Sequence, residues 1–355
     1  MLWLPALLLA VLAVLLVGTR GLAPTRVQSP SAVVIFMLLS GVVQALYWIR
    51  QGGDFMHGRV LLAPLFCLMA PLSVVPVTIP EAGGWIGDRR GAAIAAVWLG
   101  LAGWALWAAN SSGMGSDATR VTYSGIVDER RFYSQATGHS HPLTAADYLD
   151  YPRMRAILVA LNNTPDGALL LPSGNYDVWD VVPALPPPPP PPGVSRDAWR
   201  AQVAPHTVFF TNLGMVGMNV GLNTRVVDQI GLANPLAAHT ARLEDGRIGH
   251  DKNLFADWAV AEGPWLKERP WIPPYLDEGW IREAQAALGC PETVEMLASI
   301  RDPMSRPRFI GNLNRAWTFT RYRIDRVPRY ELLRCGVAEP PAEAPPYTGL
   351  PATGP

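Results

Sequence analysis

The stretch GGDFMHGR, residues 52–59, lies between two apolar runs that are each long enough to cross a membrane. It places Asp54 and His57 close to two arginines, Arg50 and Arg59, within ten residues. Charged groups are costly to hold near hydrocarbon, so such a cluster at the mouth of a helix pair predicts a functional site. The alternative is a turn at the membrane surface, in which glycines make the bend and arginines extend toward lipid headgroups.

Charged residues are distributed unevenly along the 355-residue chain. Residues 1–110 contain nine of them and the other 245 residues contain 49, so the two parts are predicted to lie in different solvents. The formal net charge of zero argues against a nucleic-acid surface, which needs a basic patch. We predict an α-helical membrane region, residues 1–110, then a soluble α/β domain, residues 111–337, and a disordered Pro/Ala/Gly-rich tail, residues 338–355.

Four apolar runs in the first part are each near the roughly 20 residues that a helix needs to cross a bilayer. They cover about residues 2–18, 31–49, 60–80 and 92–109. The first and third connections carry four arginines against two in the second, which favours the cytoplasm for the first and third. GGDFMHGR and the soluble domain are then extracytoplasmic, on the outer face of a multi-pass cell-membrane protein. Prolines 64, 71, 76 and 80 indicate that the third helix is kinked and lines a cavity.

The soluble part shows strand patterns alternating with short helical patterns, which is typical of an α/β domain. We expect strands at 167–172, 176–183, 207–211 and 225–228, and helices at 234–239, 276–288, 291–299 and 312–320. Arg321, Arg323, Arg326 and Arg329 follow at strand-like spacing. A proline-rich insertion, residues 183–195, holds seven consecutive prolines that form an extended rod. We expect it to be exposed to solvent, although a recruitment ligand is an alternative.

No cofactor or metal is predicted from these motifs. The glycine-rich turn NLGMVGMNVG, residues 212–221, has no clear helix start after it, as a dinucleotide fingerprint requires. No CxxC or Cys/His spacing supports a metal site. If the second part lies outside the cytoplasm, Cys290 and Cys335 are expected to form a disulfide, whereas Cys67 lies in an apolar run.

Several blocks together resemble one family of membrane enzymes. They are GGDFMHGR, then GIVDERRFY (125–133) with TGHSHP (137–142), then VVDQIGLANPLAAH (226–239) and GRIGHDK (246–252). This pattern resembles the terminal β-(1→2)-arabinofuranosyltransferases, which are actinobacterial C-type membrane glycosyltransferases. The resemblance implies an outer-face active site that transfers arabinofuranose from decaprenyl-phosphate arabinofuranose to an arabinan acceptor of arabinogalactan or lipoarabinomannan.

The residues in these blocks suit such a reaction. Asp54 is the candidate catalytic residue, either as a general base or as a carboxylate that stabilises oxocarbenium charge. Arg50 or Arg59 is suited to bind the lipid phosphate and His57 to hydrogen-bond sugar. The other candidate substrate-binding residues are Asp128, Glu129, Arg130, His250, Asp251 and Lys252. For residues 128–130 and for GRIGHDK, a solvated charged surface is the alternative.

The sequence also departs from the family pattern. C-type transferases usually carry more spanning helices, with the catalytic acid in the first outer loop, and four helices would leave polar cavity walls facing lipid. We therefore expect a carboxy-terminal portion of a longer enzyme, or a partner chain that supplies the missing membrane half, with Asp54 in a supporting role. The second hypothesis is a non-catalytic anchored module that binds wall glycan through Trp258, Trp265, Trp271 and Trp280, unless these fill a core.

Overall fold

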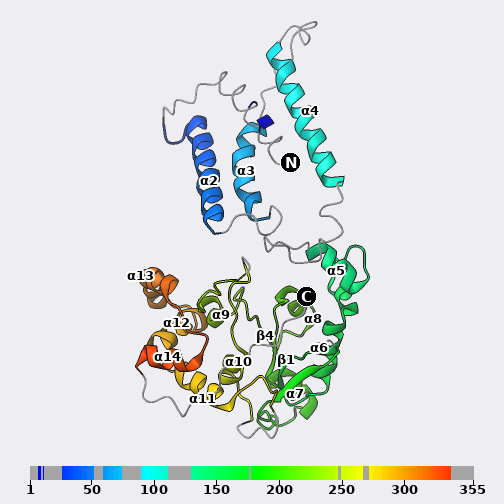
Figure 1. Cartoon of the computed structure of the whole chain (residues 1–355), viewed down its shortest axis with the longest axis vertical. Coiled ribbons are helices and arrows are strands. Elements are labelled where there is room, and N and C mark those ends of the chain that lie inside the picture. Colours follow the sequence, from blue (N-terminus) through cyan, green and yellow to red (C-terminus); the bar gives the residue numbers. More distant parts are fainter. Residues whose placement is uncertain are drawn as a thin grey trace. The chain divides into compact units, whose positions relative to one another are not determined.

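The computed structural model describes residues 7–8, 11, 26–51, 59–73, 89–110, 129–175, 177–246, 249–266 and 272–336. The chain divides into two compact units, Met1–Asp128 and Glu129–Pro355 (Figure 1). The predicted boundary at residue 110 coincides with the end of a helix, and residues 111–128 lie outside the described residues. The predicted tail, 338–355, lies outside them as well.

The first unit contains three described helices, α2 (Pro30–Arg50), α3 (Arg59–Ser73) and α4 (Arg89–Asn110). Of these, α2 is long and apolar enough to cross a membrane, and the apolar parts of the other two are shorter. Four predicted apolar runs therefore correspond to one such helix among the described residues, and the four-span arrangement remains a prediction.

Helices α2 and α3 pack closely at Gly41. A Cβ atom at this position would lie 2.8 Å from Cγ of Leu68 and 3.0 Å from the carbonyl oxygen of Pro64. Small residues allow helix backbones to approach closely in apolar surroundings, so Gly41 fixes the contact between the two helices. Pro64 and Pro71 both lie within α3.

The second unit is an α/β domain, as the alternating patterns predicted. Its elements, in chain order, are α5 (Glu129–Thr137), η1 (Ala145–Asp150), α6 (Pro152–Asn162), β1 (Ala168–Pro172), β2 (Trp179–Pro183), α7 (Arg196–Val203), β3 (His206–Phe209), α8 (Leu213–Asn219), β4 (Thr224–Val227), α9 (Pro235–His239), α10 (Ala256–Glu262), α11 (Glu278–Ala287), α12 (Pro291–Arg301), α13 (Arg306–Arg321) and α14 (Pro328–Cys335). All four predicted strands are present, with ends shifted by at most three residues.

The four strands form one mixed sheet in the order β2-β1-β3-β4. β1 and β2 are antiparallel, with Leu170 opposite Val181. β3 is parallel to both β1 and β4, and its Val208 pairs with Val226. β1 is buried on both faces, which explains why its sequence is a continuous apolar run, whereas the edge strand β4 keeps Arg225 exposed.

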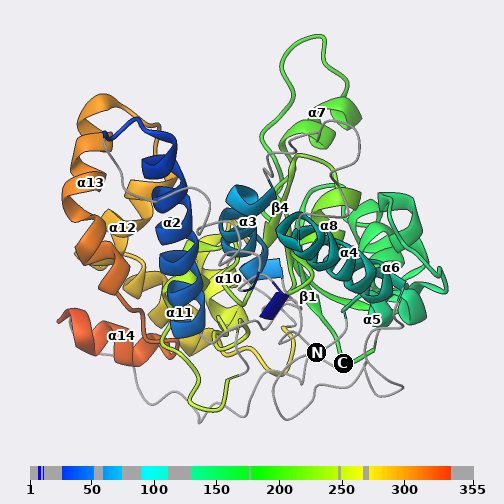
Figure 2. The same cartoon turned by 90° about the horizontal axis from the view of Figure 1, so that it is seen from above.

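Each face of the sheet carries a separate hydrophobic core. Because successive side chains of a strand point to opposite faces, β1 contributes to both. Leu169 and Leu171 join the core made by the helices from α9 to α14, and Ala168 and Leu170 join the core made with α5, α6 and α8. Figure 1 shows these two groups of helices on either side of β1 and β4, and Figure 2 shows the same unit from above.

Two sequence expectations about elements were wrong. The stretch predicted as a glycine-rich turn contains helix α8, because Met215 and Val216 are buried in a core and packing outweighs the low helix propensity of glycine. The four arginines from Arg321 to Arg329 do not form a strand. Arg321 ends α13 and Arg329 lies in α14, with a short connection between the two helices.

The proline run, 186–192, has no helix or strand structure and is mostly exposed, as predicted for an extended insertion. Its course is fixed by two hydrogen bonds. The indole Nε1 of Trp199 donates to the carbonyl of Pro188 at 2.8 Å. The backbone N–H of Leu185 donates to the carbonyl of Pro264, also at 2.8 Å.

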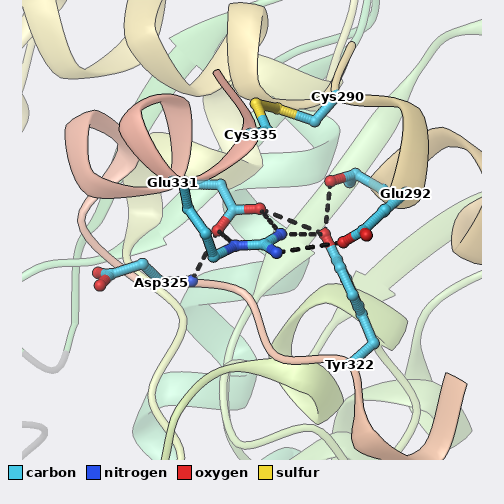
Figure 3. The surroundings of a disulfide bond; sticks show 8 residues. Cys290, Glu292, Tyr322, Asp325, Glu331 and Cys335 are labelled. Carbon is cyan, nitrogen blue, oxygen red and sulfur yellow. Dashed lines mark hydrogen bonds and ion pairs between the residues drawn. A yellow bond between two sulfur atoms is a disulfide. The ribbon is translucent and has the colours of Figure 1, made fainter. Parts of the chain in front are cut away.

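A disulfide joins Cys290, before α12, to Cys335, at the end of α14 (Figure 3). Beside it lies the fully buried carboxylate of Glu331, which receives two hydrogen bonds from the guanidinium of Arg334, at 2.6 and 2.9 Å. The hydroxyl of Tyr322 donates to Glu331 at 3.2 Å, and the backbone N–H of Asp325 donates at 3.0 Å. A buried carboxylate requires such partners, so this network fixes residues 322–325.

Candidate functional site

The loop that follows β4 is built around the buried carboxylate of Asp228. Its two oxygens accept hydrogen bonds from three successive backbone N–H groups, those of Leu232, Ala233 and Asn234, at 2.7 to 2.8 Å. Asp228 is completely buried, so its negative charge is balanced by these amides in place of water. The aspartate of the VVDQIGLANP motif therefore holds a loop in shape.

The same loop sets the position of α9. Asn234 caps the helix by accepting a hydrogen bond from the N–H of Ala237 at 3.1 Å. Gly231 has a φ of +82°, and a Cβ atom there would lie 2.5 Å from the backbone nitrogen of Ala238. Glycine is required at this close approach, which places His239 at the end of α9.

His239 contacts the segment that the disulfide and Glu331 hold in place. Its ring Nδ1 lies 3.1 Å from the carbonyl oxygen of Tyr322, and its own carbonyl accepts a hydrogen bond from the N–H of Ile324 at 2.8 Å. Thr240 and Ile324 form an isolated parallel bridge. Arg323, between Tyr322 and Ile324, is thereby brought next to α9.

A third segment, residues 249–253, completes the site. The ammonium of Lys252 donates to the carbonyl oxygen of Ala238 at 2.5 Å. Asp251 forms an ion pair with Arg242, at 3.1 Å between Oδ2 and Nε. The backbone of Asp251 also accepts a hydrogen bond from the N–H of Leu243 at 2.6 Å, so this loop closes on itself.

We call His239, Arg242, Asp251, Lys252 and Arg323 the cationic cluster. Partial burial lowers the pKa of Lys252, and the positive charges of Arg323 and Arg242 lower it further, while Asp251 raises it. Burial also lowers the pKa of His239, and Arg323 and Lys252 lower it further, while the hydrogen bond to the Tyr322 carbonyl opposes this change. These mutual effects are expected where like charges are held close together.

The cationic cluster has an excess of positive charge. The cluster contains two guanidinium groups and one ammonium against the single carboxylate of Asp251, which pairs with Arg242, and the lowered pKa of His239 favours its neutral form. Arg242 and Arg323 are exposed, whereas Lys252 and His239 are half-buried. Such an arrangement is suited to bind an anion with charge-assisted hydrogen bonds, and phosphate groups are the anions that arginine and lysine most often recognise.

The structure brings together three of the predicted site residues, His250, Asp251 and Lys252. Arg50 ends α2 and Arg59 begins α3, in the other unit. The other predicted residues of the membrane part and its junction, Asp54, His57 and Asp128, lie outside the described residues.

Glu129 and Arg130 are placed away from this cluster. They begin α5, which contributes Tyr133 to the core on one face of the sheet. The cationic cluster adjoins Leu236 and Leu254, which belong to the core on the opposite face. Helices α5 and α9 therefore pack on opposite faces of the sheet, and a shared site for these two groups of predicted residues remains a prediction.

Three members of the cluster were missed as site residues in the sequence. His239 ends the VVDQIGLANPLAAH motif, and Arg323 is one of the four arginines between residues 321 and 329, but neither was given a chemical role. Arg242 had no signal of its own. Within the described ranges, no group of three or more His, Cys, Asp or Glu side chains is placed to hold a metal ion.

The tryptophans that suggested a glycan-binding surface are largely interior. Trp258, Trp265 and Trp280 are all buried in one core, and Trp271 lies outside the described residues. The indole N–H of Trp258 donates to the carbonyl of Arg326 at 2.8 Å, which satisfies its polar atom within the domain. These three side chains are therefore not available to stack on sugar rings.

Comparison with known proteins places this site in a known domain. Residues 193–326 match the AftB family C-terminal domain. The matched region contains β3, β4 and the whole cationic cluster. The Asp228 loop and α9 also lie within it.

Two curated relatives extend the similarity beyond the AftB domain. The terminal β-(1→2)-arabinofuranosyltransferase of Mycobacterium tuberculosis is 59% identical over 366 residues, covering 97% of this chain and 57% of the relative. The protein of the same name from Corynebacterium glutamicum is 36% identical over 302 residues, covering 82% of this chain and 41% of the relative. The resemblance predicted from the sequence motifs is confirmed. No solved structure matches the chain.

Proposed function

We propose that this chain forms the outer-face part of a membrane glycosyltransferase that transfers arabinofuranose from decaprenyl-phosphate arabinofuranose to arabinan of arabinogalactan or lipoarabinomannan. The observation that carries the proposal is the 59% identity to a terminal β-(1→2)-arabinofuranosyltransferase over 97% of this chain. The chain spans about 57% of that relative's length, so activity, donor and acceptor are all parts of the proposal.

The cationic cluster supplies the physical argument for the donor. A polyprenyl-phosphate sugar presents a phosphodiester whose negative charge has to be held while the bond between sugar and phosphate breaks. Lys252 and Arg323 offer cationic donors at one place in the domain, and the hydrogen bond to Ala238 fixes the ammonium. Cationic side chains that are held in place before the reaction stabilise the developing phosphate anion because they do not have to reorient. The cationic cluster therefore assists departure of the lipid phosphate.

The membrane region supplies the remaining groups in this proposal. It is a multi-pass region in which Asp54 receives the proton of the acceptor hydroxyl or stabilises the oxocarbenium ion, and Arg50, His57 and Arg59 bind donor. The second unit lies outside the cytoplasm, as expected for a domain with a disulfide. Further membrane helices, on this or a partner chain, complete the lipid cavity because four helices would expose its polar wall to lipid.

The test is transfer from decaprenyl-phosphate arabinofuranose to an arabinan acceptor, measured with the protein in native membranes. Lys252→Met is expected to reduce kcat/KM about tenfold to a hundredfold, the effect of losing about 1.4 to 3 kcal/mol of charge-assisted binding. Asp54→Asn is expected to reduce kcat more strongly than it changes KM.

A matched control is Arg155→Met. Arg155 is exposed and pairs with Asp150 at 3.6 Å, near the core on the opposite face of the sheet. This variant is expected to retain wild-type turnover. Equal losses in Arg155→Met and Lys252→Met would contradict a specific role for the cluster, and unchanged turnover in Asp54→Asn would remove GGDFMHGR from the reaction.

A further inference from the structure

Helix α13 is unusual for a helix of a folded domain because none of its 16 residues is buried. One side of the helix is attached to the domain, and on it Phe319 is partly buried against the core made by the helices from α9 to α14. The guanidinium of Arg308 donates to the carbonyl of Ala298 at 2.6 Å and to Asp302 at 2.7 Å, and the side chain of Asn312 donates to the carbonyl of Ser299 at 2.8 Å. These contacts hold α13 against α12, at the periphery of the second unit (Figures 1 and 2).

The opposite side of α13 is an exposed apolar stripe, which we define as Phe309, Ile310, Leu313 and Trp317. Their exposed fractions are 53%, 47%, 61% and 69% respectively. Phe309, Leu313 and Trp317 follow one another at intervals of four residues, so they share one face of the helix. By helical periodicity this face points away from the Arg308 and Asn312 contacts. Exposing four large apolar side chains to water is unfavourable in free energy, which indicates that a binding partner covers the stripe.

The charges around the stripe indicate what covers it. Helix α13 has four arginines and no acidic residue. Arg306 and Arg321 lie at its two ends beside the stripe, and the Arg321 guanidinium carbon is 4.4 Å from the centre of the Trp317 ring. Arg315, on the attached side, forms an ion pair with Glu295. A helix with Trp, Phe and Leu on one side and arginines at its margins has the composition of helices that lie in a membrane interface.

We propose that α13 lies in the surface of an anionic phospholipid bilayer, with the apolar stripe inserted among the lipids and Arg306 and Arg321 at the headgroups. The positive margins are complementary to lipid phosphates, whereas a protein partner would require acidic groups opposite them. The chain also contains α2, which is long and apolar enough to cross a membrane and so agrees with a bilayer as the partner. This contact would orient the domain relative to the membrane.

The experiment uses the full chain in nanodiscs of phosphatidylglycerol or of phosphatidylcholine. A nitroxide label is attached at Leu313→Cys or Phe309→Cys in a Cys67→Ser background. Matched controls carry it at Thr318→Cys or Asn314→Cys, two exposed positions off the stripe. All four replace exposed side chains, so the fold is not at risk. The measured quantity is the ratio of collision rates with oxygen, which enters lipid, and with a water-soluble nickel complex.

We expect this ratio to be at least threefold higher for the two stripe positions than for the controls in phosphatidylglycerol. The difference is expected to shrink in phosphatidylcholine and after replacing both Arg306→Gln and Arg321→Gln. Equal ratios at stripe and control positions would overturn the proposal. A stripe protected from both reagents would also overturn it, because a protein surface would then cover α13. Turnover is not measured, so these outcomes are independent of the proposed transferase activity.

Discussion

The Lys252 ammonium donates a hydrogen bond to the carbonyl oxygen of Ala238, which lies in the last turn of α9. This contact joins the loop 249–253 to the helix that carries His239. It also places a partly desolvated cation next to Arg323, as the lowered pKa of Lys252 reflects. The hydrogen bond to Ala238 stabilises the fold, whereas burial and the neighbouring guanidinium groups destabilise the charged form of Lys252. The two effects on the free energy of unfolding therefore oppose each other.

Replacing Lys252 by methionine is expected to change the free energy of unfolding by no more than about 1 kcal/mol. The lost hydrogen bond is offset by relief from burying a charge close to two arginines. A thermal melt of the variant beside wild type measures this directly. A fall in Tm of more than about 8 °C would mean that Lys252 is needed mainly for folding.

Replacing Asp228 by alanine is expected to destabilise the second unit by about 3 kcal/mol or more. Three backbone N–H groups lose their acceptor at once. That of Asn234 is buried and those of Leu232 and Ala233 are partly buried. An unsatisfied buried group costs about 1 to 3 kcal/mol, and water partly relieves the other two. Denaturant unfolding gives the change. Asp245→Asn, which alters an exposed carboxylate in a turn, is the control and should stay within about 0.5 kcal/mol of wild type. A similarly small effect of Asp228→Ala would show that the loop does not depend on the carboxylate.

The Gly231→Ala variant tests the close approach between the loop and α9. The left-handed backbone costs alanine about 1 to 2 kcal/mol, and the contact of its Cβ with Ala238 adds about 1 to 3 kcal/mol. The control is Gly217→Ala within α8, where a Cβ atom would meet nothing within 4 Å. That change is expected to be neutral or stabilising by about 0.5 to 1 kcal/mol. Unfolding measurements that rank the two variants in the reverse order would contradict the structure.

Removing the disulfide with Cys290→Ser and Cys335→Ser together is expected to cost about 2 to 4 kcal/mol. The bond closes a loop of 45 residues, so its loss frees the unfolded chain. Wild type treated with reductant should show the same loss, and Cys67→Ser should show none, because Cys67 is a free cysteine. Insensitivity of the Tm to reductant would contradict the bond.

The buried Asp257 in α10 gives a prediction about pH. Burial raises its pKa from 3.8 to about 6, although the N–H of Asp277 donates to it at 3.2 Å. Between pH 4 and 6 the folded state keeps a proton that the unfolded chain has released, so stability falls as pH rises. Asp257→Asn removes this effect, and its advantage over wild type should grow by about 2 to 3 kcal/mol from pH 4 to pH 7. Denaturant unfolding of both proteins at four pH values measures this difference in free energy. A difference that does not change with pH would contradict the raised pKa of Asp257.

Much of the second unit could be predicted from local sequence patterns. The strands were found because apolar runs bounded by glycine and proline have few other structures open to them. Helix α8 was missed because Gly214 and Gly217 have low helix propensity and only the fold shows that Met215 is buried. The arginines after residue 320 were misassigned because their spacing of two or three residues fits a strand as well as it fits the end of one helix and the start of another.

The site was predictable only in part. GRIGHDK gathers its charges locally, so Asp251 and Lys252 were found as neighbours in sequence. Arg323 reaches Lys252 from about 70 residues away, through the bridge between Thr240 and Ile324. No local pattern reports such a contact. For the same reason the sequence could not show that α5 and α9 pack on opposite faces of the sheet.

The division of β1 between two hydrophobic cores limits how this domain can change its length. Inserting or deleting one residue within Ala168–Pro172 would turn every later side chain of the strand to the wrong face, so that both interiors lose their leucines together. Natural variants of this domain should accordingly vary in length in the exposed proline segment and keep β1 at constant length.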